Sequence, residues 1–272
     1  MTSDRDKDSQ DPTHIDPLKD TYHENIVENP LFLKSLEAKD TALLVIDMQY
    51  LDAAEGCGVF ADVLKSGVRP EEARYYFDQL KHKVIPNIVR LQGTFRAHRM
   101  EVIHTRIQAL TRDGRDRSAG HKRLGLLAAP GSREAEFLPE VAPVGDELVI
   151  NKTSSGVFPT TNLYYVLRNM GINALFVAGV YTNECVSSTV RAGCDLGFHM
   201  TLVEDCCTTV TPELHESSVA VLRDRYCRVI DTDQAVAEID RYVSDLRKRG
   251  ISTLVPEDRI YDEFPPGERK EA

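Results

Sequence analysis

The chain has 272 residues, of which 42% are hydrophobic and 28% charged, and it carries a formal net charge of −10 at pH 7. This length and composition predict one large α/β domain with a sizeable core. The negative charge argues against nonspecific binding to nucleic acid or to anionic membranes, and no apolar run is long enough to predict a transmembrane helix.

Residues 1–30 are polar, charged and nearly free of aromatic residues. We therefore expect a flexible arm, followed by a single domain over residues 31–272 that ends in a short C-terminal extension. The first 20 residues have no apolar core, so we expect no secretory signal and a cytoplasmic location. The six cysteines form no C-x-x-C pair, which fits reduced thiols in that compartment.

From residue 41 onward, strand-like and helix-like segments alternate along the chain. The predicted strands cover residues 41–49, 100–107, 146–153, 173–180, 199–207 and, with a turn, 227–236. The predicted helices cover residues 71–99, 160–172, 185–198 and 212–226. Pro86 is expected to kink or divide the first helix, and Gly171 to end the second. This alternation predicts a parallel sheet with right-handed crossovers.

Reactive side chains follow the predicted strand ends, where ligands bind in parallel sheets. Asp47 ends the first strand, Lys152 follows the third and Cys185 follows the fourth. Thr182 is a plausible N-cap that puts Cys185 in the first turn of a helix, where free N–H groups and the helix dipole stabilise a thiolate. Lys152 would keep Asp47 ionised as a base for the thiol proton. The ordinary alternatives are a structural cysteine, a turn aspartate and a solvated lysine.

Three motifs carry a family resemblance: ALLVIDMQ at 42–49, GVYTNECVSSTVRAGCDLGF at 179–198 and VEDCC at 203–207. With a lysine about a hundred residues after the first motif, they resemble the isochorismatase-like cysteine hydrolases over about residues 40–240. The resemblance implies a three-layer α/β/α fold with a mostly parallel, about six-stranded sheet, in a homodimer or homotetramer.

The same resemblance implies how the site is built. It assigns Asp47, Lys152 and Cys185 as the catalytic triad. It also implies a cis peptide bond between Val180 and Tyr181, and an oxyanion hole formed by the backbone N–H groups of Tyr181 and Cys185. The flanks IHTR and EDCC look more like biuret and ureido-amide hydrolases than nicotinamidases.

The family's branches differ in metal and nucleophile. Nicotinamidases carry a zinc site after the first strand, whereas residues 47–60 contain no histidine here, so we expect no metal and no cofactor. A cysteine together with Lys152 favours hydrolysis of the C–N bond in a small carboxamide or ureido substrate, through a thioester and with release of ammonia. The alternatives are a vinyl-ether hydrolase of the isochorismatase type and a thiol or redox-binding protein without turnover. A nucleotide-binding domain ranks last, because the glycine-rich phosphate motifs are absent.

Two segments supply candidate substrate contacts. The loop at 152–162, KTSSGVFPTTN, resembles the family loop that lines the pocket, so Ser155, Val157 and Phe158 are candidates. Tyr181, just before the TNEC turn, is another candidate.

Three further candidates lie at the ends of the first two predicted strands. Arg106 and Gln108 would suit a carboxylate or a ureido group if they point inward, and otherwise belong to an exposed basic loop. Gln49 either braces the turn near Asp47 and the substrate or is purely structural. His104, at the end of the second strand, is expected to be hydrogen-bonded to backbone and not catalytic.

Overall fold

The computed structural model describes residues 40–248, so the predicted arm and C-terminal extension lie outside the described residues. Six strands form one sheet in the order β3-β2-β1-β4-β5-β6, and every neighbouring pair is parallel. The strands are β1 (Thr41–Ile46), β2 (Glu101–Ile107), β3 (Leu148–Lys152), β4 (Ala174–Val180), β5 (His199–Thr208) and β6 (Arg228–Ile230). The predicted fold class is confirmed.

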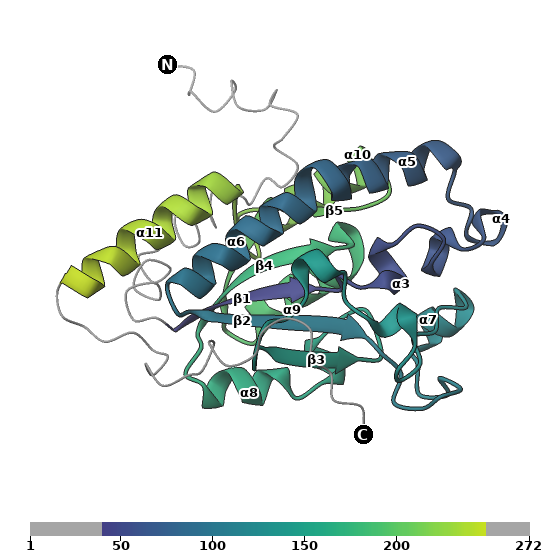
Figure 1. The fold of residues 1–272 in the computed structure, drawn as a ribbon, viewed down its shortest axis with the longest axis horizontal. Helices are drawn as coiled ribbons and strands as arrows, with labels where there is room; N and C mark the ends of the chain where they lie inside the picture. The colour runs from purple at the N-terminus through teal and green to yellow at the C-terminus, as the bar shows by residue number, and fades with distance from the viewer. Residues whose placement is uncertain (1–39, 249–272) are drawn as a thin grey trace, which may run out of the picture.

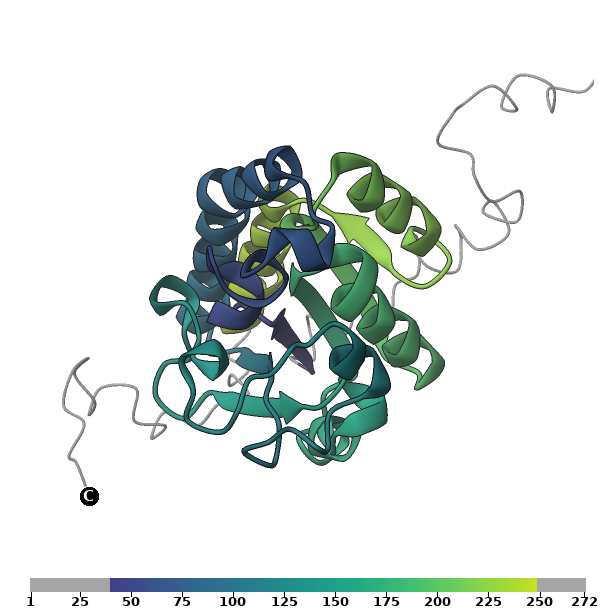
Figure 2. The same ribbon diagram turned by 90° about the vertical axis from the view of Figure 1, so that its right-hand side faces the viewer.

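Helices cover both faces of the sheet (Figures 1 and 2). The described helices and helical turns are α3 (Tyr50–Ala53), η3 (Gly58–Phe60), α4 (Val63–Ser66), α5 (Pro70–Gln79), η4 (Leu80–Val84), α6 (Ile85–Ala97), α7 (Ala119–Arg123), η5 (Arg133–Ala135), η6 (Pro139–Val141), η7 (Phe158–Thr160), α8 (Leu163–Asn169), η8 (Thr182–Val186), α9 (Ser187–Asp195), α10 (Pro212–Leu222) and α11 (Thr232–Lys248). Figure 1 shows α6 and α11 side by side over one face. Apolar residues of α8, α9 and α10 pack against the other face.

The central strand β1 explains why the first apolar run is continuous. Its residues alternate between two cores: Leu44 and Ile46 pack with α8, α9 and α10, whereas Leu43 and Val45 pack with α5, α6 and α11. Because successive side chains of a strand point to opposite faces, a strand covered on both sides must be apolar at every position.

The long helix predicted over residues 71–99 is a continuous helical segment with one widened turn. The π-helical turn η4 separates α5 from α6, and the Ile85 N–H donates to the carbonyl of Leu80. Pro86 follows in the first turn of α6. Proline lacks an N–H and clashes with the carbonyl four residues earlier, and the wider turn relieves that conflict. The expected kink or division of the helix near Pro86 therefore takes the form of the widened turn η4.

A close approach between β1 and β4 requires Gly179. Its φ is +119°, and a Cβ built there would lie 2.0 Å from the carbonyl oxygen of Ile46. Only glycine fits such a contact. The pairing of β4 with β5 shifts register between Val177 and Gly179. The peptide bond that follows, between Val180 and Tyr181, is cis.

The helix α11 was missed from the sequence, which predicted only a turn after the last strand. Ala235 and Ile239 are fully buried in the core shared with α6, and Tyr242 packs against it. Their spacing of four and three residues is that of one helix face. Within residues 40–248, no helix combines the length and apolarity needed to cross a membrane.

Candidate active site

Three buried side chains from separate strand ends meet at the carboxyl edge of the sheet. The Lys152 ammonium Nζ lies 2.7 Å from Oδ2 of Asp47 and 3.4 Å from Sγ of Cys185. Asp47 and Lys152 are completely buried, and Cys185 is 3% exposed. Buried charges of opposite sign stabilise each other strongly only when they are this close.

Asp47 is held by the strand next to its own. Its φ is +54°, a left-handed conformation that aspartate tolerates better than most residues. Its backbone N–H donates to the carbonyl of Thr105 at 3.0 Å, and the Thr105 hydroxyl donates to Oδ1 at 3.2 Å. Oδ2 is thereby left to face Lys152.

Lys152 is the last residue of β3, and its ammonium has three acceptors. Besides Asp47 and the Cys185 sulfur, its Nζ donates to the carbonyl of Ser154 at 3.0 Å. Burial alone would lower the pKa of Lys152, but Asp47 and Cys185 outweigh burial and the pKa lies above its ordinary value. Lys152 is therefore an ammonium ion at neutral pH.

Cys185 lies in the π-helical turn η8, which leads into α9. The residue at the N-cap position is Tyr181 and not Thr182, so the predicted N-cap is wrong. The Thr182 hydroxyl instead bonds Nδ1 of His215 at 2.9 Å. This contact with α10 could not be read from the local sequence.

The protonation state of Cys185 differs from the stabilised thiolate expected from its position. Burial raises the pKa of the Cys185 thiol well above its usual value, and Asp47 raises it further, while Lys152 acts in the opposite direction. The resting residue is therefore a thiol, and attack on a carbonyl requires a base that takes its proton.

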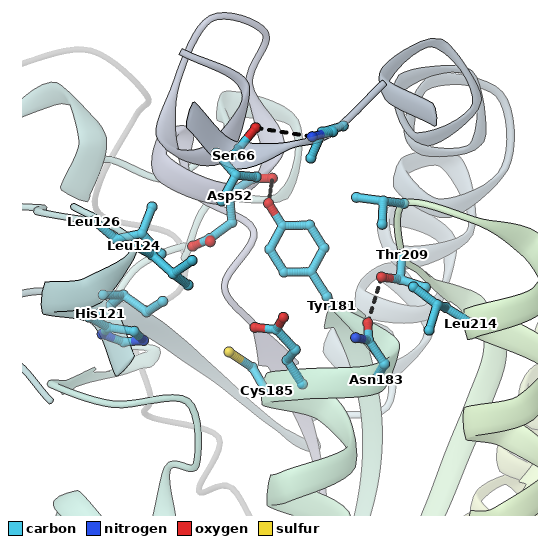
Figure 3. A pocket seen from close by; sticks show the side chains of 15 residues that line it. Asp52, Ser66, His121, Leu124, Leu126, Tyr181, Asn183, Cys185, Thr209 and Leu214 are labelled. Carbon is cyan, nitrogen blue, oxygen red and sulfur yellow. Dashed lines mark hydrogen bonds between the residues drawn. The ribbon is translucent and has the colours of Figure 1, made fainter. Parts of the chain in front are cut away.

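A cavity of about 210 Å³ opens beside the Cys185 sulfur (Figure 3). Tyr181 lines it, as predicted. The other lining residues are Asp52, Val59, Ser66, Val68, Ile107, His121, Leu124, Leu126, Asn183, Glu184, Cys185, Thr209, Val210 and Leu214. The walls are mainly apolar, with a few polar groups close to the thiol, which is the usual composition of a small-molecule site.

Three titratable residues of this cavity were missed from the sequence. Burial raises the pKa of Asp52 well above its ordinary range, and the nearby Asp47 carboxylate adds to the rise. Burial also raises the pKa of Glu184. Burial lowers the pKa of His121, and Lys152 lowers it further. Perturbed groups that gather in one cleft mark a functional site.

A comparison with protein families shows to which family the chain belongs. A model described as "Isochorismatase domain" matches residues 41–234, which is more than half of the chain. The chain belongs to the isochorismatase family. It is therefore an isochorismatase-family hydrolase.

Two curated relatives and one solved structure illustrate the likeness. Ureidoacrylate amidohydrolase RutB of Acinetobacter baylyi is 29% identical over 219 residues, which cover 74% of this chain and 84% of RutB. N-carbamoylsarcosine amidase of an Arthrobacter species is 27% identical over 165 residues, which cover 58% of this chain and 61% of that amidase. A cysteine hydrolase from Pseudomonas syringae pv. phaseolicola matches with a TM-score of 0.62 at 21% identity, over 75% of this chain and 94% of its own, which shows a common fold.

Gln49 is structural in this isochorismatase-family hydrolase. Its amide donates to the carbonyls of Ile107 at 2.9 Å and Glu134 at 2.7 Å. Its Oε1 accepts the N–H of Ile107 at 2.5 Å. Both donors and the acceptor of the side chain therefore bond backbone groups, which fits the structural alternative and leaves no group of Gln49 for the substrate.

Arg106 and Gln108 also lie outside the residues that line the cavity. Arg106 donates to Oδ1 of Asn151 at 2.7 Å and to the carbonyl of Ala135 at 2.8 Å. Its guanidinium lies over the Phe137 ring. These contacts hold it against β3 and the loop before it, so the condition for recognising a carboxylate or ureido group, a side chain that points into the cavity, is not met. Gln108 is 8% exposed, and its Oε1 has no hydrogen-bond partner among the described residues.

The loop after Lys152 packs into the core and does not line the cavity. Val157 is completely buried and Phe158 is 7% exposed. Phe158 stacks on Phe198 with ring centroids 5.6 Å apart. Ser155 is half-buried and is not among the lining residues. The predicted substrate contacts of this loop are therefore wrong. Its apolar side chains, Val157 and Phe158, pack instead into the core on the side of α9.

His104 has a carboxylate partner and not the expected backbone one. Its Nε2 lies 3.0 Å from Oε2 of Glu147, and its side chain is completely buried. Among residues 40–248, no group of three or more histidine, cysteine, aspartate or glutamate side chains is arranged to hold a metal ion.

Proposed function

We propose that this isochorismatase-family hydrolase is a cysteine-dependent amidohydrolase. Its substrate is a small carboxamide or ureido compound, and its products are ammonia and the corresponding acid. One observation carries the proposal: a fully buried ammonium, Lys152, lies within 3.4 Å of the Cys185 sulfur and 2.7 Å of the Asp47 carboxylate, beside a cavity for a small molecule.

The first half-reaction forms a thioester. Asp47 takes the proton of the Cys185 thiol, and the sulfur attacks the amide carbonyl to form a C–S bond. The backbone N–H groups of Tyr181 and Cys185 stabilise the oxyanion. As the C–N bond breaks, protonated Asp47 gives its proton to the leaving nitrogen, which departs as ammonia.

The second half-reaction releases the acid. Asp47, again a carboxylate, takes a proton from water, and the hydroxide attacks the thioester carbonyl. The C–S bond breaks, and the proton on Asp47 returns to the sulfur. Lys152 keeps Asp47 ionised between steps and stabilises the developing thiolate. The sum is amide plus water giving acid plus ammonia.

Two kinds of observation support C–N hydrolysis. The names of RutB and of N-carbamoylsarcosine amidase describe them as an amidohydrolase and an amidase. The burial of Cys185 and the raised pKa of its thiol weigh against a redox sensor, which needs an exposed cysteine of low pKa.

The experiment is an ammonia-release screen over carboxamides, biuret and ureido acids, with wild-type protein, Cys185→Ser and Cys194→Ser. Cys194 is a half-buried cysteine of α9 outside the cavity and serves as the matched control. We expect Cys185→Ser to lower kcat/KM at least about 1,000-fold and Cys194→Ser to leave it unchanged. Release of ammonia by Cys185→Ser at the wild-type rate would contradict the proposal. A vinyl-ether hydrolase would release no ammonia and would keep its activity in Cys185→Ser.

The cytoplasmic location and the homodimer or homotetramer stay predictions. The absence of a required cofactor is likewise proposed, since the steps above use only side chains of the chain and water.

A further inference from the structure

Asp52 carries a buried carboxylate with one oxygen, Oδ2, that has no hydrogen-bond partner in the described part of the chain. Asp52 lies in α3 and is 3% exposed. Its side chain lines the cavity beside Cys185. Figure 3 shows the carboxylate pointing into that cavity. A buried polar group without a partner is costly, so this one points to a ligand that supplies the partner.

The backbone around Asp52 is fixed by two tyrosines. The Tyr76 hydroxyl donates to the carbonyl of Asp52 at 2.8 Å, and the Tyr181 hydroxyl donates to the same carbonyl at 3.0 Å. The two rings lie 5.2 Å apart, and Tyr181 also borders the cavity. These contacts hold α3 in place and leave the carboxylate aimed at the substrate space.

The described residues that line the cavity include acids but no cation to balance a substrate anion. Among the described residues that line it, none is a lysine or an arginine, and Glu184 is a second acid. Lys152 is occupied by Asp47. Burial lowers the pKa of His121, so its ring is neutral at pH 7. Its buried Nδ1 atom also lacks a hydrogen-bond partner in the described part of the chain.

This balance of charge favours one class of substrate. A substrate carboxylate would lose its water here without gaining a counter-ion from the described lining residues. An N–H group would instead give Asp52 its missing partner. The cavity volume of about 210 Å³ suits a small molecule.

We propose that Asp52 determines substrate specificity: it accepts a hydrogen bond from an N–H group remote from the scissile carbonyl, and the enzyme acts on amides that bear no carboxylate. This deepens the proposed amide hydrolysis and rests on it.

The test uses substrates of equal size that differ in charge at the remote end. Succinamide and succinamate form one pair, and 3-ureidopropionamide and 3-ureidopropionate form a second. The kcat/KM of each is measured at pH 8 for wild-type protein, Asp52→Asn, Asp52→Ser and Asp78→Asn. Asp78 is exposed on α5 and outside this cavity, so its variant makes the same substitution at the surface.

Wild-type protein should have a kcat/KM at least about tenfold higher for the uncharged member of each pair than for the member with a carboxylate. The ratio is corrected for the second hydrolysable group of the uncharged member. Asp52→Asn should lower this preference at least about fivefold, chiefly through a lower KM for the carboxylate-bearing member. A gain of activity on one substrate is not expected from damage to the fold. Asp78→Asn should keep the wild-type ratio.

Two results would overturn the proposal while leaving amide hydrolysis intact. One is a wild-type preference for succinamate and 3-ureidopropionate, which needs no variant to fold. The other is a preference that is the same in wild type, Asp52→Asn and Asp52→Ser. If no amide in either pair or in the wider screen yields ammonia, the proposed function fails and this specificity fails with it.

Discussion

Two buried ionic clusters lie on the same sheet but differ in what surrounds them. The Cys185 cluster consists of Asp47, Lys152 and Cys185 and borders the cavity. The Glu147 cluster consists of Glu147, Arg96 and His104. In it, Oε1 of Glu147 accepts from Arg96 at 2.7 Å, and Oε2 accepts from Arg96 at 2.9 Å, from His104 at 3.0 Å and from the N–H of Val144 at 3.0 Å.

The difference shows that a buried charge is not in itself a sign of function. Both oxygens of Glu147 are used, and none of the three residues lines the cavity at Cys185. In contrast, the thiol of Cys185 lies against a space that a substrate can fill, and Oδ2 of the neighbouring Asp52 has no partner in the described residues. Spare bonding capacity beside a cavity distinguishes the reactive cluster from the structural one.

The largest expected effect comes from breaking the Cys185 cluster. Lys152→Met removes the ammonium and keeps much of the side-chain volume, so the Asp47 carboxylate is left buried and unpaired. We expect kcat/KM for the best amide to fall at least about 1,000-fold and the free energy of unfolding to fall by about 3–5 kcal/mol. Ammonia release and urea unfolding measure the two effects.

The double variant Asp47→Asn/Lys152→Met separates these two losses. Removing both charges should restore most of the stability, to within about 1–2 kcal/mol of wild type, because no uncompensated charge remains. Activity should stay as low as in Lys152→Met. If the double variant were as active as wild type, the pair would have only a structural role.

Breaking the Glu147 cluster should affect stability alone. Glu147→Gln keeps the shape of the side chain but removes the charge that binds Arg96 and His104. We expect the free energy of unfolding to fall by about 2–3 kcal/mol at pH 7 and kcat/KM to stay within about twofold of wild type. Glu140→Gln, which removes an exposed charge, is the control for stability.

The pH dependence of this loss of unfolding free energy also distinguishes the Glu147 cluster from the Cys185 cluster. Burial alone would raise the pKa of Glu147, but hydrogen bonds from His104 and Arg96 outweigh it and lower the pKa to about 2, from an ordinary value of 4.5. A carboxyl with a lowered pKa stabilises the fold fully above pH 4.5 and loses that contribution as pH falls toward 2. The difference in unfolding free energy between wild type and Glu147→Gln should therefore shrink below pH 4.5. A difference that stays constant from pH 7 to pH 3 would contradict this assignment.

The sequence predicted the parts of the site that depend on strand ends. Each apolar run fixes where a buried strand stops, and the ends of parallel strands share one edge of the sheet. The pattern of strands was therefore enough to bring Asp47, Lys152 and Cys185 together. The fold class was predicted for the same reason.

Side-chain direction in the loops was not predictable in the same way. Arg106 turns to Asn151 and Ala135 because of contacts across 45 and 29 residues of chain. Phe158 joins the core through its contact with Phe198. Such partners are distant in sequence, so local resemblance to a pocket loop gave the wrong contacts.

Asp52 was missed because of its local setting. In the stretch DMQYLDAAEG it resembles an ordinary exposed acid near a turn. Its burial depends on Tyr76 and Tyr181, which reach its carbonyl from 24 and 129 residues away. The helix α11, in contrast, is predictable from the local sequence, because its apolar residues Ala235, Ile239 and Tyr242 have helical spacing.

The central claim is that Cys185 carries the acyl group during turnover, and a partition experiment with hydroxylamine tests it most directly. The amide that releases ammonia fastest and its methyl ester are each turned over with added hydroxylamine, which attacks a thioester to give a hydroxamic acid and the free thiol. A common acyl-enzyme on Cys185 predicts the same ratio of hydroxamic acid to carboxylic acid from both substrates, and neither product with Cys185→Ser. Ammonia release without any hydroxamic acid, or different ratios from the two substrates, would contradict the account.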